Sequence, residues 1–83
     1  MEKSIYTREY KVLLRLLRET RERAGVTQVE LARRLAQTQS YVSKVELGDR
    51  RLDLVQLRTI LAALGAGLGD FVARFEGAID DQE

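Results

Sequence analysis

The chain has 83 residues, and its 14 Lys and Arg against 13 Asp and Glu give a net charge of +1. A chain of this length buries only about 60% of its unfolded surface, so we expect one domain with a single core. The sequence contains neither Cys nor His. This excludes disulfides, the usual zinc ligands and an imidazole base.

Charge is distributed unevenly along the chain. Residues 1–51 contain 12 Lys and Arg and 7 Asp and Glu, whereas residues 52–83 contain 2 and 6. The two parts therefore carry +5 and −4, which fits either a face that meets a polyanion or an uneven scatter of solvated charges. No apolar run approaches the roughly 18 residues that span a bilayer, so we expect no membrane partner and a cytoplasmic protein.

Leu, Ala, Arg, Glu and Gln dominate the sequence, without the alternation of β-branched residues typical of strands, so it predicts an all-α class. The first helix is expected from about Thr7 to Ala24, before Gly25. Its apolar face is predicted to contain Tyr10, Leu13, Leu14, Leu17 and Ala24. Val12 and Leu16 form a second apolar edge, which meets either the last helix or a partner.

Two short helices follow. The first is predicted from Thr27 to Leu35, with Thr27 and Glu30 as a capping box and Leu31 facing inward beside Leu35. The second is predicted from Thr38 to about Leu47.

The second short helix buries Val42 and Val45, and Gly48 is suited to the left-handed position that ends it. Helices of about nine residues are unstable in isolation, so both short helices need packing against the rest of the chain.

The fourth helix begins with a predicted capping box of Asp53 and Gln56 and ends before Gly65. Its expected buried residues are Leu54, Leu57, Ile60, Leu61 and Leu64. A fifth helix over residues 68–79 has an apolar stripe of Leu68, Phe71, Val72, Phe75 and Ile79. The five helices predict a compact orthogonal bundle, with an N-terminal extension over 1–9, a domain over 10–79 and a frayed acidic tail over 80–83.

The two short helices and the turn between them have the geometry of a helix-turn-helix, in which the second helix enters the major groove of DNA. From this pattern alone, a purely structural helical hairpin is favoured over a DNA-binding one. Residue identities narrow the choice: Thr-Gln opens the first of the two helices, Glu-Leu-Ala lies inside it, and Ser-Lys and Glu-x-Gly occur in the second.

With these four features in register, the sequence over about residues 10–76 resembles the Cro/repressor (Xre, lambda-repressor-like) family of bacterial and phage regulators. The resemblance implies a lambda-repressor-like fold and sequence-specific binding of double-stranded DNA. It also implies that the protein is a transcriptional repressor and needs no cofactor. The alternative is an antitoxin or interaction module of the same fold, which acts on a protein partner. No catalytic or metal-binding motif is present, so we expect no enzyme.

The resemblance also implies roles for individual residues. Base contacts are expected from Gln39, Ser40 and Lys44, since Gln can bind adenine bidentately and Lys can reach guanine or a phosphate. Phosphate contacts are expected from Gln28, Tyr41, Ser43, Arg50 and Arg51. Tyr41 alternatively folds back onto the preceding helix, and each polar residue can instead be simply solvated.

The remaining expectations concern packing and symmetry. Arg21 and Glu46 are expected to form a structural ion pair between the first and third helices. A palindromic operator requires two copies about 34 Å apart, and Val72, Phe75 and Ile79 are candidates for a homodimer surface unless that stripe is core.

Two residues depart from the family pattern in the turn after the second helix. Ala36 occupies a position where the family mostly has Gly, and a left-handed Ala costs about 1–2 kcal/mol. Gln37 stands where an apolar residue often packs. Both departures lie in the turn that sets the pose of the second short helix.

Overall fold

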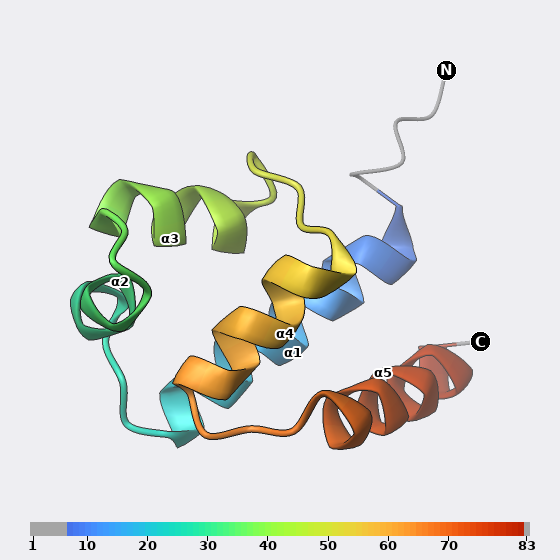
Figure 1. Ribbon diagram of the computed structural model, residues 1–83. Coiled ribbons are helices and arrows are strands. Elements are labelled where there is room, and N and C mark those ends of the chain that lie inside the picture. Colours follow the sequence, from blue (N-terminus) through green and yellow to red (C-terminus); the bar gives the residue numbers. More distant parts are fainter. Residues whose placement is uncertain (1–6, 83) are drawn as a thin grey trace.

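The structure is a computed structural model that describes residues 7–82. It contains five α-helices: α1 (Arg8–Arg23), α2 (Gln28–Leu35), α3 (Gln39–Leu47), α4 (Leu54–Ala63) and α5 (Leu68–Gln82) (Figure 1). No strand occurs within this range. Helix α3 packs on α1 and α2, α5 packs on α1 and α4, and the chain bends by 110° between α4 and α5. The predicted all-α orthogonal bundle is therefore confirmed.

The predicted helix starts are confirmed by their caps. The N-cap oxygens of Thr7, Thr27 and Thr38 accept from the backbone N–H groups of Tyr10, Glu30 and Tyr41 at 3.0–3.1 Å. Asp53 and Gln56 form the predicted reciprocal box at α4. The box predicted at α2 is only half formed, because the Glu30 carboxylate instead accepts from Arg33 and Arg34. Two guanidinium groups compete for the carboxylate more strongly than one backbone amide.

The core corrects the predicted face of α1. Val12 and Leu16 are buried, whereas Leu13 and Leu14 are only partly buried and Ala24 is exposed. Because α3 and α5 both pack against α1, its buried surface is wider than the single stripe that the periodicity predicts. The second apolar edge is therefore core within the domain.

The predicted core of α4 is confirmed except at its start. Leu57, Ile60, Leu61 and Leu64 are buried, but the Leu54 side chain is 65% exposed. Leu54 is the first residue of α4, and it is exposed together with the next residue, Val55. Helical spacing therefore predicts the buried face of α4 correctly, but it does not predict where along the helix that burial begins.

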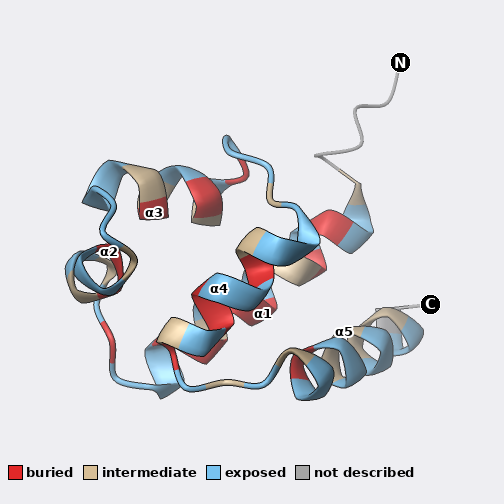
Figure 2. Ribbon diagram, in the orientation of Figure 1, coloured by how far each residue is buried: buried red, intermediate tan, exposed pale blue. Residues whose placement is uncertain are grey.

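Helix α5 divides its apolar stripe between core and surface. Phe71 is buried and Val72 is 41% exposed, while Leu68, Phe75 and Ile79 pack partly buried against the core (Figure 2). The helix continues to Gln82, so residues 80 and 81 are helical where a frayed tail was predicted from residue 80. Most of the predicted extension over 1–9 lies outside the described residues, and the domain limits stay a prediction.

The turn between α2 and α3 adopts the strained conformation that its sequence suggests. Ala36 has φ 55° and ψ 41°, in the left-handed region. The Gln37 N–H donates to the Ala32 carbonyl at 2.9 Å and the Ala36 N–H to the Arg33 carbonyl at 3.1 Å, the bonds of a Schellman cap. An L-residue with a Cβ is disfavoured at such a position.

Replacing Ala36 by glycine is therefore expected to stabilise the domain. The loss of left-handed strain outweighs the greater flexibility of unfolded glycine, which gives a net gain of about 0.5–1 kcal/mol in unfolding free energy. Urea denaturation of Ala36→Gly and of the unsubstituted protein measures this difference in unfolding free energy. The control Ala73→Gly, at an exposed position in the interior of α5, should lose about 1 kcal/mol instead. An equal loss in both variants would contradict this account of the turn.

Candidate nucleic-acid interface

Helix α3 has one buried face and one exposed face. Val42 and Val45 are buried in the core, while Ser40, Lys44 and Leu47 are exposed. Figure 2 shows buried and exposed segments alternating along α3. Residues three and four apart share a helix face, so these three side chains form one outward row. All three residues predicted to contact bases are therefore accessible. Ser40 and Lys44 belong to this row, and Gln39 is exposed at the N-terminal end of α3.

A buried ion pair holds α3 against α1. The Arg21 Nε donates to Glu46 Oε2 at 2.6 Å and its Nη2 donates to Oε1 at 3.1 Å, which makes the pair bidentate. The side chains are only 11% and 7% exposed. The remaining Arg21 nitrogen, Nη1, donates to the Val26 carbonyl at 2.9 Å in the α1–α2 connection. The predicted structural ion pair is present, and its guanidinium has a partner for each nitrogen.

The hydrogen bond from Arg21 to Glu46, together with the nearby negative charge, raises the pKa of Arg21 above its ordinary value, despite partial burial. Arg21 is therefore charged at every accessible pH. The protonation of this guanidinium does not limit the stability of the contact between α1 and α3.

Gln28 joins the ion pair to the start of α3. Its Nε2 donates to Glu46 Oε1 at 3.0 Å, and its Oε1 accepts from Gln39 Nε2 at a long 3.4 Å. A chain of contacts therefore runs from Arg21 through Glu46 and Gln28 to Gln39. Sequence reasoning treated Gln28 and Gln39 as independent, and the spacing of 18 residues between Gln28 and Glu46 contains no signal that would reveal the link.

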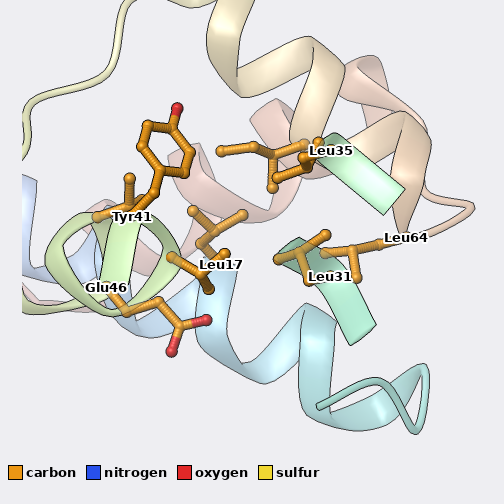
Figure 3. Close-up of a pocket in the computed structure, with 9 residues that line it drawn as sticks. Leu17, Leu31, Leu35, Tyr41, Glu46 and Leu64 are labelled. Atoms are coloured by element: carbon orange, nitrogen blue, oxygen red, sulfur yellow. The ribbon is translucent and has the colours of Figure 1, made fainter. Parts of the chain in front are cut away.

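Tyr41 packs on the edge of the core while its hydroxyl remains outside. The ring lies against the buried cluster, and the Arg50 guanidinium carbon stands 5.1 Å from the ring centroid. This is cation–π distance. In Figure 3 the hydroxyl points away from Leu17 and Leu35. The two orientations considered for Tyr41 are therefore combined, since its ring packs on the bundle while its hydroxyl points outward.

The two arginines of the α3–α4 connection separate. Arg50 lies over Tyr41 of α3, whereas the Arg51 guanidinium carbon is 4.8 Å from the ring centroid of Tyr10 in α1. The Tyr10 hydroxyl accepts from the Leu52 N–H at 3.3 Å, so the same tyrosine also fixes the connection. The structure places Arg50 beside the outward face of α3 and Arg51 over α1.

A small apolar gap lies between the helices. It is lined mainly by leucines and valines, with Leu17, Leu31, Leu35 and Leu64 converging on it (Figure 3). Its volume is about 10 Å³, and a water molecule needs about 10–15 Å³. The gap is a packing defect and offers no room for an organic ligand.

Two further cations near this surface are already paired. Hydrogen bonds from Arg33 and Arg34 lower the pKa of Glu30 to about 2. The Arg34 Nη1 also donates to the Ala63 carbonyl at the end of α4, at 2.8 Å. The ordinary pKa of a Glu carboxyl is 4.5, so the folded state stabilises the ionised form of Glu30 more than the unfolded state does. The contribution of this cluster to folding is therefore present above pH 4.5 and is lost as the pH falls towards 2.

Residues 7–82 contain no cluster of three or more carboxylates that would hold a metal ion. In the same range no single helix is long and apolar enough to cross a membrane, although α4 and α5 reach that length together across their bend.

The buried pair gives a stability prediction. Replacing Glu46 by alanine leaves Arg21 buried without its carboxylate, so the unfolding free energy should fall by about 3–5 kcal/mol. The control Glu19→Ala breaks the exposed pair with Arg15 on α1 and should cost less than about 1 kcal/mol. Chemical denaturation compares them, and similar small losses in both would show that the Glu46 pair is not structural.

Comparison with known proteins agrees with this architecture. A family model described as a helix-turn-helix domain matches residues 12–75. The structure is similar to that of an XRE-family like protein from Pseudomonas syringae pv. tomato str. DC3000, at 40% sequence identity and a TM-score of 0.80 over 84% of this chain and 85% of that one. No curated protein gives a significant match. The chain belongs to the Xre family of helix-turn-helix DNA-binding regulators.

Proposed function

We propose that the protein binds a specific double-stranded DNA operator as a small bacterial or phage transcriptional repressor, with residues 38–47 in the major groove. The observation that carries the proposal is the outward face of α3, whose candidate base readers are exposed while its opposite side is fixed to α1 and α2. Repression needs no catalysis, because occupancy of an operator is sufficient. The proposed location is the cytoplasm, in association with the nucleoid.

Gln39 is the proposed principal base reader. It stands at the N-terminal end of α3, the part of a recognition helix that contacts base edges, and its amide can pair with adenine N6 and N7. In the free protein its Nε2 donates to Gln28 Oε1 at a long 3.4 Å, a weak contact that DNA can replace. Ser40 and Lys44 extend the reading surface along the outward row.

Phosphate contacts are proposed on both sides of this surface. Gln28 retains a second amide hydrogen after its bond to Glu46, and the first backbone N–H groups of α2 have no intrahelical acceptor, which suits an anion. Arg50 is the favoured cation at the other end, where its guanidinium lies over the Tyr41 ring. The Tyr41 hydroxyl and Ser43 are further candidates on α3. Arg51 is also proposed to contact a phosphate, and to do so its guanidinium has to move away from the ring of Tyr10.

A homodimer on a palindromic operator remains part of the proposal. Val72 is the most exposed of the three residues considered for its surface, since Phe75 and Ile79 pack partly against the core. A selected site with two-fold symmetry would support this arrangement. A protein partner in place of DNA is the rival function.

The proposal is tested by fluorescence anisotropy with random-sequence duplex across a salt series. Selection from a random pool then supplies a preferred duplex. Salt-dependent binding to random duplex, and tighter binding to the selected one, are expected. Absence of binding to any duplex near physiological ionic strength would contradict DNA recognition and favour a protein partner.

Gln39→Ala tests base readout. It should weaken binding of the selected duplex by about 1–3 kcal/mol and leave random duplex almost unchanged, because the lost contact is to a base edge. Anisotropy with both duplexes measures the difference. Equal losses on the two duplexes would refute the assignment.

Arg50→Ala tests positioning on the backbone. Both duplexes should lose affinity alike, and the slope of log K against log salt should become shallower by about 0.9, the value for one phosphate contact. Arg18→Ala is the matched control, since Arg18 is an exposed arginine of α1 that pairs with Glu22. An unchanged slope for Arg50→Ala would remove it from the interface.

A further inference from the structure

Leu47 is an exposed apolar residue in the middle of a polar surface. Its side chain is 71% exposed. It lies one helical turn beyond Lys44 and two turns beyond Ser40, so it belongs to the same outward row. Val42 and Val45 already fill the buried side of α3, so no place in the core is open to this side chain.

The end of α3 holds this side chain outward. Gly48 ends the helix in the left-handed region, at φ 87°, and the Asp49 N–H donates to the Lys44 carbonyl at 2.9 Å. Gly48 is buried so closely that an added Cβ would stand 3.2 Å from Leu14 Cδ1 of α1. The last turn is therefore fixed against the bundle, and Leu47 cannot rotate inward without breaking this cap.

The chemistry of the major groove identifies what such a side chain meets. Base edges there present hydrogen-bond donors and acceptors to Gln, Ser and Lys, and one apolar group, the C5-methyl of thymine. Ser40 and Leu47 are separated by about 10 Å along the helix axis, which corresponds to about three base-pair steps of DNA at 3.4 Å each. Leu47 thus reaches beyond the bases that Ser40 contacts.

We propose that Leu47 is a specificity-determining residue that packs on a thymine methyl group at the end of each half-site. The proposal rests on the proposed function, since it requires α3 in the major groove. It assigns to an apolar residue a base preference that the polar readers Gln39, Ser40 and Lys44 do not supply.

Single substitutions of uracil for thymine test the contact, because uracil keeps the pairing and lacks only the methyl group. In the duplex obtained by selection, one position in each half-site should show a Kd about fourfold weaker with uracil, the effect of one buried methyl. Leu47→Ala should bind the thymine duplex more weakly and lose the discrimination between thymine and uracil at that position.

Val55→Ala is the matched control, because Val55 is an equally exposed apolar residue, 73% exposed, but lies on α4. It should keep the thymine preference. Retention of that preference in Leu47→Ala, or a selected site without thymine at the position, overturns the assignment while specific duplex binding still stands. Absence of salt-dependent binding to any duplex overturns the proposed function together with it.

Discussion

The bidentate contact between Arg21 and Glu46 is the interaction on which the rest of the structure depends. Helices α2 and α3 have eight and nine residues, too few for stability in water, so their orientation comes from packing. A buried ion pair stabilises a fold only when its charges are fully hydrogen-bonded, because removing them from water costs several kcal/mol. Here the Val26 carbonyl and the Gln28 amide complete the bonding, and within the described residues no buried side-chain polar atom lacks a partner.

The same contact connects stability to DNA recognition. The Glu46 carboxylate faces inward to Arg21, and through Gln28 it reaches Gln39 at the surface. The residue that fixes α3 to the bundle is therefore linked, through Gln28, to the side chain proposed to read a base. Preorganisation of this kind lowers the entropy lost on binding. It also means that a change at Gln28 would affect both its proposed phosphate contact and its contact with Gln39.

Local sequence signals predicted most of the fold. Threonine caps and glycine stops are short-range features, so the starts of α1, α2 and α3 and the end of α3 at Gly48 agree with the structure. Features that depend on neighbouring helices were missed. The burial of Val12 and Leu16 needs α3 and α5 in place, and Leu54 is exposed although Leu57 of the same apolar stripe is buried.

The candidate site shows the same division. The exposure of Gln39, Ser40 and Lys44 follows from the periodicity of α3, and the Arg21–Glu46 pair follows from the family resemblance. The bond from Gln28 to Glu46 and the position of Arg51 over Tyr10 join residues 18 and 41 apart in sequence. Such contacts depend on how α1, α2 and α3 cross, which no short-range pattern encodes.

The central claim, that α3 held by this network is the DNA-binding face, is tested most directly by NMR titration of the labelled protein with duplex DNA. The largest shift changes are expected at the side-chain amides of Gln28 and Gln39 and at the backbone amides of residues 39–51. Changes confined to α4 and α5, with the two glutamine amides unmoved, would contradict it.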